Sequence, residues 1–257
     1  MRALFRLTLL QMLGRKKFWI LILFLGLPVV LVGLVLAAGG FRDVGPEETE
    51  TISSIVLYVL YPQSMCLLAA LVYGASLLAG EIEDKTLVYL FTRAQPRWKV
   101  LFGKYVITVL ILGLMTNLSF TICYLMLGLP GGFNVYAAVS VTIFAAILAY
   151  TAIFCLFGLV VPRRAIPIGI LYGFTFEVFL ASVPAVINVI TVSHYLRSLA
   201  LRIADIPVDE DLSEVLAITA GASPLRAVTA ISCLALLTLC LSGLLIHRRE
   251  WPLNEEA

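Results

Sequence analysis

"FWILILFLGLPVVLVGLVLAA", residues 18–38, decides the fold class of this chain, because it contains no charged side chain. An α-helix rises about 1.5 Å per residue, so about 20 apolar residues cross the roughly 30 Å hydrocarbon core of a bilayer. Backbone groups inside a bilayer must be satisfied within the protein, so each such run is expected to be helical. The predicted membrane spans are 18–38, 52–79, 106–127, 136–161, 165–190 and 227–246.

The composition of the whole chain excludes a soluble protein. Hydrophobic residues make up 61% and charged residues only 13% of the 257 residues, and the mean hydropathy is +1.03. Soluble domains carry about 25% charged residues. A cleaved signal peptide is not favoured, because residues 18–38 exceed the roughly 7–15 apolar residues of such a segment. We therefore expect an all-α polytopic membrane protein, with residues 1–257 forming a single transmembrane domain.

The distribution of basic residues predicts the orientation of the six spans. With both termini in the cytoplasm, the inner segments hold 14 of the 18 Lys and Arg residues. The outer segments hold the other four, which are Arg42, Arg197, Arg202 and Arg226. This bias over short loops is the positive-inside pattern. The net charge of +2 therefore reflects topology, and the expected surroundings are membrane lipid, with no nucleic acid as a partner.

Two segments outside the spans have patterns of their own. Residues 1–17 are short, basic and apolar, which favours either an interfacial helix leading into the first span or a plain basic anchor. Residues 191–224 form the longest predicted outer segment. Within it, the pattern from His194 to Ile203 indicates an amphipathic helix, which could lie on the membrane surface or dip part-way into it.

Sequence motifs for catalysis and for metal binding are missing. There is no phosphate loop, no H-E-x-x-H pair and no G-x-S-x-G turn. The only two histidines, His194 and His247, are predicted on opposite sides of the membrane. The five cysteines fall in apolar runs without C-x-x-C spacing, and we interpret them as buried packing residues. We therefore expect no enzyme activity, no cofactor and no metal in this chain.

Glu177 is the one ionisable residue near the middle of a predicted span. A carboxylate in hydrocarbon costs several kcal/mol, so it is expected to face the bundle interior or a water-filled cavity. Two interpretations stay open. It could contact a substrate or a proton along a pathway, together with Asn117. Alternatively, it is a protonated acid hydrogen-bonded to a neighbouring helix, with Asn117, Thr116 and Ser119 as candidate partners.

Residues 80–105 form the most charged inner segment between two spans. Glu81 precedes Lys85 by one helical turn, which is the favourable order for an ion pair. Ala94-Gln95-Pro96 then breaks the chain, because the residue before proline avoids the α region, and Pro96 suits the first turn of a new helix. The pattern predicts a helix–break–helix elbow facing the cytoplasm. A solvated loop anchored by basic residues is the alternative.

The order of residues in this elbow resembles the permease subunits of ABC-2 type transporters. The matching groups are Glu81-Ile82-Glu83, Thr86-Leu87, Arg93-Ala94-Gln95-Pro96-Arg97 and Gly103-Lys104-Tyr105. The six-span layout, the basic N-terminal segment and the long outer segment before the last span resemble the same family, so the likeness covers nearly the whole chain. The chain departs from the family at Lys85, where the family usually has glycine.

The resemblance implies a type V exporter-like transmembrane domain whose elbow holds a coupling helix for a separate ATP-binding subunit. Two permeases, as a homodimer or pseudo-dimer, would assemble with two ATPases in a bacterial cytoplasmic (inner) membrane. ATP and magnesium would then be bound by the partner ATPase. By position, the residues implied in coupling are Glu81, Glu83, Asp84, Lys85, Thr86, Arg93 and Arg97.

Two other functions stay open at the level of sequence. A proton-coupled secondary transporter would use Glu177 as its proton site. Such transporters usually have two related halves, and no internal repeat stands out in this sequence. A non-transporting membrane scaffold or assembly factor is the other alternative.

Overall fold

The computed structural model describes residues 16–40, 45–83, 97–181, 189–204 and 223–248, and these are almost entirely helical. No strand occurs among them. The helices, in chain order, are α2 (Lys16–Ala37), α3 (Pro46–Tyr58), the π-helix η1 (Val59–Met65), α4 (Cys66–Glu83), α6 (Arg97–Met126), α7 (Gly132–Val160), the 3-10 turn η2 (Pro162–Arg164), α8 (Ala165–Tyr172), the π-helix η3 (Gly173–Leu180), α9 (Val192–Ala204) and α11 (Pro224–Arg248).

Five helical stretches in the described residues are long and apolar enough to cross a membrane. They are Phe18–Ala37, Glu48–Ala79, Trp98–Met126, Gly132–Val160 and Pro224–Arg248. Each overlaps one predicted span, so the prediction of a helical membrane protein is confirmed. The second stretch is one continuous rod, because α3, η1 and α4 follow each other without a break.

The predicted span 165–190 is not among these five stretches. Its described helix consists of α8 and η3 and ends at Ala181, and the next described helix, α9, begins at Val192. The described residues therefore do not form a single helix over the whole of 165–190. The sixth span stays a prediction.

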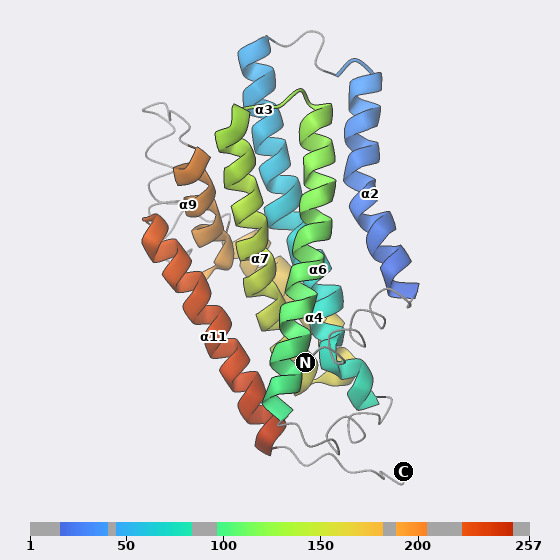
Figure 1. Cartoon of the computed structure of the whole chain (residues 1–257), viewed down its shortest axis with the longest axis vertical. Coiled ribbons are helices and arrows are strands. Elements are labelled where there is room, and N and C mark those ends of the chain that lie inside the picture. Colours follow the sequence, from blue (N-terminus) through green and yellow to red (C-terminus); the bar gives the residue numbers. More distant parts are fainter. Residues whose placement is uncertain (1–15, 41–44, 84–96, 182–188, 205–222, 249–257) are drawn as a thin grey trace.

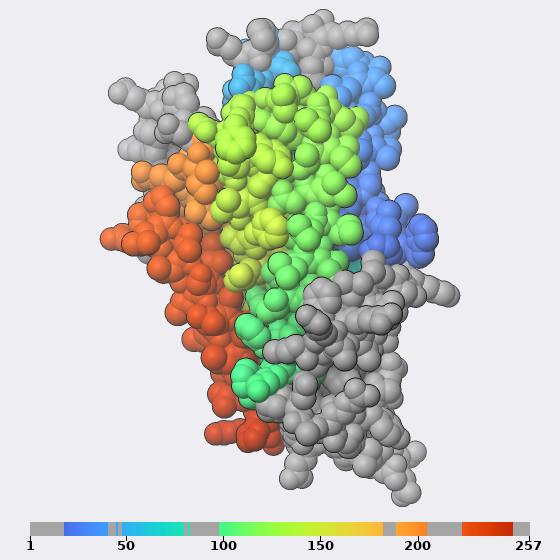
Figure 2. All heavy atoms as spheres, in the orientation of Figure 1, coloured from blue at the N-terminus to red at the C-terminus, as the bar shows by residue number. Residues whose placement is uncertain are grey.

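The long helices run side by side along the longest axis of the molecule (Figure 1). The start of α2, the end of α4, the start of α6 and the end of α11 lie toward one end, as the predicted orientation requires of the inner ends. On the face shown in Figure 2, α6 and α7 lie between α2 on one side and α11 on the other. The shorter α9 packs against α7 and α11.

Small residues let α4 and α7 approach closely, and these two helices form the most extensive contact in the bundle. A Cβ atom on Gly74 would lie 3.0 Å from the carbonyl oxygen of Thr151. A Cβ atom on Gly158 would collide with the carbonyl oxygen of Ala75. Membrane helices associate largely through such close packing, because burial of apolar surface from lipid provides no driving force.

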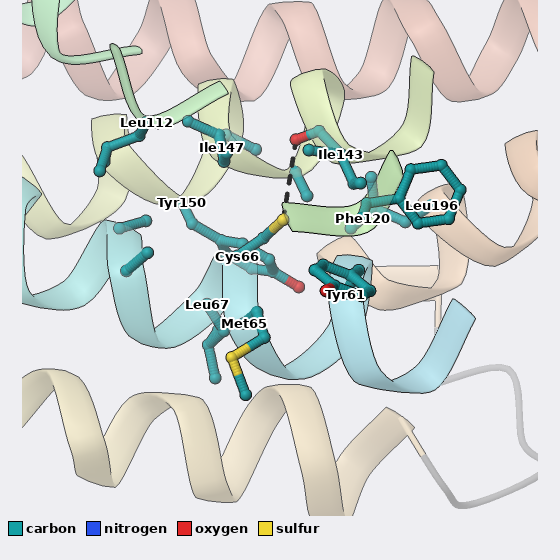
Figure 3. Packing of buried hydrophobic residues seen from close by; sticks show 14 of the residues in the cluster. Tyr61, Met65, Cys66, Leu67, Leu112, Phe120, Ile143, Ile147, Tyr150 and Leu196 are labelled. Carbon is teal, nitrogen blue, oxygen red and sulfur yellow. Dashed lines mark hydrogen bonds between the residues drawn. The ribbon is translucent and has the colours of Figure 1, made fainter. Parts of the chain in front are cut away.

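The core around this contact is built from large apolar and aromatic side chains. Tyr61, Phe120, Ile143 and Tyr150 are fully buried, and they lie within one cluster (Figure 3). The Cys66 thiol points at the carbonyl oxygen of Ile143, at 3.9 Å. A close-packed centre of this kind holds the polar groups described below in defined positions.

The outward faces of the helices are apolar, as expected where lipid replaces water. On α2, Trp19 is 72% exposed and Leu23 is 76% exposed, and on α11 Leu225 is 76% exposed. Cys66, Cys123 and Cys155 are buried, which confirms the packing interpretation for these three cysteines. The same interpretation is wrong for Cys233 and Cys240, because both lie on the exposed face of α11.

Candidate functional site

Glu177 lies in η3, and its side chain is only 1% exposed. A π-helix is rare, forms i to i+5 hydrogen bonds and often occurs at functional sites. The chain reaches η3 through α8, which packs closely on α4. A Cβ atom on Gly173 would lie 3.0 Å from Leu67 of α4, and one on Gly169 would collide with Leu71. Close packing at two glycines one turn apart therefore fixes the helix that carries Glu177.

Three further elements supply hydrogen-bond donors to the Glu177 carboxylate. The Tyr150 hydroxyl on α7 donates to Oε2 at 2.9 Å, and the Tyr172 hydroxyl on α8 donates to Oε1 at 3.1 Å. At the start of α9, the Val192 amide donates to Oε1 at 3.2 Å. Ser193 donates to Oε2 through its amide at 2.9 Å and through its hydroxyl at 2.7 Å. We call these five residues the Glu177 cluster.

The two amides belong to the first turn of α9, whose N–H groups have no partner within the helix. The N-terminus of a helix also carries a partial positive charge, which favours a nearby anion. Glu177 therefore acts as an N-terminal cap for α9, although it lies 15 and 16 positions before the residues it caps. The carboxylate is a bridge between α7, α8, η3 and α9.

The chemistry of the five donors suits an ionised carboxylate. A carboxylate only accepts hydrogen bonds, whereas a neutral acid must donate one of its own. All five interactions with the Glu177 carboxylate bring an N–H or O–H group to it. Hydrogen bonds to a charged group are also about twice as strong as neutral ones. The two backbone amides can only donate, one to each oxygen, so they hold the carboxylate in a fixed position as a bridge between helices.

Arg197 places a positive charge one helical turn after Ser193 on α9. The charge of Arg197 acts on Tyr58, at the end of α3, and Tyr58 also lies within the electrostatic reach of Glu177. Burial of a carboxylate is far less costly when opposite charge and hydrogen bonds compensate it. The α9 N-terminus and the five hydrogen bonds provide such compensation for Glu177.

The amphipathic pattern predicted for His194–Ile203 corresponds to α9. Leu196 and Leu199 are 1% and 2% exposed, and Ser198 is fully buried. Most of the helix is therefore covered by the protein, and its position relative to the membrane surface stays a prediction. The helix packs inside the bundle against α7 and α11.

Asn117 does not join Glu177, although the sequence grouped them as intramembrane polar residues. Its Nδ2 atom donates to the carbonyl oxygen of Ser140 on α7, at 3.3 Å. Ser119, another suggested partner of Glu177, donates to the carbonyl oxygen of Leu25 on α2, at 2.6 Å. The suggested partners were therefore wrong, because both α6 side chains hold α6 against other helices.

A second buried polar network was missed by the sequence reasoning. The Tyr61 hydroxyl in η1 lies 2.8 Å from the Ser119 hydroxyl and donates to the Cys123 thiol at 3.1 Å. Through Ser119, the network reaches the Leu25 carbonyl and links η1, α6 and α2. We call these four residues the Tyr61 cluster. The neighbouring Pro62 could have drawn attention to this network in the sequence, because proline disturbs the helical hydrogen-bond ladder.

Three of the residues implied in coupling lie in described helices. Glu81 and Glu83 belong to the last turn of α4, and Arg97 is the first residue of α6. Asp84, Lys85, Thr86 and Arg93 lie outside the described residues, so the predicted elbow stays a prediction. Beyond it, the Tyr105 hydroxyl on α6 donates to the Leu148 carbonyl of α7 at 2.7 Å.

No cluster of three or more His, Cys, Asp or Glu side chains that could hold a metal ion occurs in the part of the chain that the structure describes. No protein-family model, curated protein or solved structure matches this chain.

Proposed function

We propose that this chain is the permease subunit of an ABC-2 type transporter, working with a separate ATP-binding subunit. The observation that carries the proposal is the charged elbow between α4 and α6 in a bundle of otherwise apolar helices. Its order of acids, Thr-Leu, Arg-x-x-Pro-Arg and Gly-Lys-Tyr resembles that family. The helical membrane fold and the position of the two helix ends at the predicted inner end of the bundle support it (Figure 1).

In the proposed assembly, two permease copies span a bacterial inner membrane six times each, with their termini in the cytoplasm. The pathway would lie at their interface, and export is the expected direction. ATP and magnesium would bind to the ATPase subunits, since this chain has no phosphate loop. Closure of the ATPases would push the elbow and tilt the helices between two arrangements.

The acids at the end of α4 would make the contact that couples ATP hydrolysis to the helices. Glu81 and Glu83 occupy the last turn of α4, where the rod α3–η1–α4 ends. A force applied there acts on the whole rod, and the close packing of Gly74 and Gly158 connects the rod to α7. Movement of the elbow would therefore be transmitted to the centre of the bundle.

The test is the effect of charge reversal on a copurified ATPase. The tagged chain is purified from its native membrane with its partner, and ATP hydrolysis and ATP-dependent flux are measured in vesicles. Glu81→Lys with Glu83→Lys should abolish at least about tenfold stimulation of ATP hydrolysis, which corresponds to about 1.4 kcal/mol of lost coupling, while membrane insertion stays normal.

The matched control reverses two acids at the other end of the same rod, Glu47→Lys with Glu48→Lys. This pair should leave ATPase stimulation unchanged, because α3 begins at the opposite end of the bundle (Figure 1). Full stimulation by the Glu81/Glu83 variant would refute the coupling assignment. Flux driven by a proton gradient without any ATPase would instead support the secondary transporter. The absence of both activities would support the non-transporting scaffold.

The geometry of Glu177 weighs against the secondary transporter. A proton site has to exchange its proton with water on both sides of the membrane in turn. Glu177 is 1% exposed, and five donors from three other elements surround its carboxylate. These interactions stabilise the charged form and hold it in one position, which is the opposite of what a proton carrier requires.

A further inference from the structure

α9 is a short helix that depends on its neighbours for its position. It has 13 residues, and an isolated helix of that length is marginal in water. Its first turn is held by Glu177, which accepts the Val192 and Ser193 amides. We propose that the Glu177 carboxylate is a charge-dependent latch that docks the first turn of α9 in the bundle and releases that turn when the charge is lost.

The latch works through charge, because a neutral side chain of the same shape cannot satisfy the same donors. A glutamine amide offers one oxygen as an acceptor, and its nitrogen only donates. Oε2 accepts from Tyr150 and twice from Ser193, whereas Oε1 accepts from Tyr172 and Val192. A hydroxyl can also accept, so either orientation of a glutamine would leave one backbone N–H, that of Val192 or Ser193, facing an N–H group.

The release is expected to be local to α9. The bundle is held elsewhere by close helix contacts that do not involve Glu177, such as the approach of Gly74 to Thr151 and of Gly158 to Ala75. Regions with fewer independent contacts open first when an interaction is removed. The opening begins at the first turn of α9, where the Glu177 bonds lie, and extends to Ser198, whose hydroxyl donates to the His194 carbonyl of that turn.

The elements that pack around Glu177 bring other titratable or charged side chains near its carboxylate. The described titratable or charged ones are Tyr150 of α7, Tyr172 of α8, Tyr58 of α3 and Arg197 of α9. None of them is a second acid that could take over the capping of α9. The latch therefore depends on one charge, and it does not depend on the proposed transport function.

Amide hydrogen exchange in lipid nanodiscs tests the latch directly, because the Val192 and Ser193 amides are two of its bonds. Glu177→Gln should accelerate exchange at the start of α9 at least about tenfold, while exchange in α7 stays unchanged. The matched control is Glu50→Gln. The Glu50 carboxylate also accepts a backbone N–H, from Gly131 at 2.7 Å, but at the exposed end of α3. This control should leave α9 unchanged.

Thiol labelling at Ser198 gives an independent readout of the same motion. The Ser198 hydroxyl is fully buried and donates to the His194 carbonyl at 2.9 Å, so cysteine is a close substitute there. In a background with Cys233→Ala and Cys240→Ala, which removes the two exposed thiols, Ser198→Cys should react slowly. Adding Glu177→Gln should increase the labelling rate several-fold.

Unchanged exchange at α9 in a folded Glu177→Gln protein would overturn the latch. Equal acceleration in α7 and α11 would also overturn it, because that result means general loosening. If Glu177→Gln does not fold, Ser193→Ala decides the question, since it removes the 2.7 Å hydroxyl bond and leaves the charge. A few-fold acceleration confined to α9 would support the latch, and no acceleration would overturn it.

Discussion

The two π-helical stretches among the described residues hold buried polar networks of opposite kind. In η1, Tyr61 joins a neutral network of a hydroxyl, a thiol and a backbone carbonyl. In η3, Glu177 joins a network that is centred on a carboxylate. Both networks link several helices, and both central residues are buried, at 0% and 1% exposure. The comparison separates the effect of charge from the effect of burial.

The difference teaches which network holds a helix in position. Interhelical hydrogen bonds between neutral groups in membrane proteins contribute on average about 0.6 kcal/mol. Hydrogen bonds to a charged group contribute about 1.5–3 kcal/mol, and unsatisfied buried donors add a further cost. The Tyr61 cluster lies between long helices that pack without it. The Glu177 cluster holds the first turn of a short helix, which also packs against α7 and α11.

The largest effect is expected from Glu177→Ala, which removes the acceptor of all five donors. We expect the free energy of unfolding to fall by about 3 kcal/mol or more, because several buried donors lose their partner at once. Equilibrium unfolding in detergent micelles measures this. Glu50→Ala is the control, since it removes one exposed bond. Equal losses in the free energy of unfolding would mean that the buried Glu177 interactions stabilise the protein no more than the single exposed bond of Glu50.

A matched pair of tyrosines gives the next largest effect and the sharpest comparison. Tyr150→Phe removes a donor to the carboxylate, and Tyr61→Phe removes a hydroxyl from the neutral cluster. Both rings are fully buried, so the change in packing is the same. We expect losses of about 1.5–3 kcal/mol for Tyr150→Phe and about 0.6 kcal/mol for Tyr61→Phe. Similar losses in unfolding experiments would contradict the distinction drawn between the clusters.

Ser119→Ala tests whether the Tyr61 cluster acts as a unit. It removes the bonds to Tyr61 and to the Leu25 carbonyl, and we expect a loss of about 0.6–1 kcal/mol. Combined with Tyr61→Phe, the loss should be less than the sum of the two single losses, because both variants remove the same bond. A strictly additive double variant would show that the two hydroxyls do not interact.

The smallest change in the free energy of unfolding is expected for substitutions outside both clusters, which serve as the reference for the others. Cys233→Ala and Cys240→Ala change exposed thiols on α11. We expect each to alter the free energy of unfolding by less than about 0.5 kcal/mol, as surface substitutions usually do. A larger loss at either cysteine would show that this face of α11 is covered by a partner in the assembled protein.

Most of the fold class was predictable from the sequence, whereas the contents of the site were not. Runs such as 18–38 and 136–161 predicted membrane helices, because hydropathy over about 20 residues is a local property of the chain. Glu177 was singled out for the same reason, as the one acid inside such a run. Its suggested partners on α6 were wrong, because spacing along the chain does not say which helices are neighbours in space.

The sequence by itself determined that this protein is a helical membrane protein and that Glu177 must be compensated inside it. The physical reason is that the costs of exposing backbone and charge to hydrocarbon depend on each segment alone. Only the tertiary structure decided how the compensation is made. Tyr150 lies 27 positions before Glu177 in the chain and Ser193 lies 16 positions after it, and the packing of α7 and α9 brings them to one carboxylate.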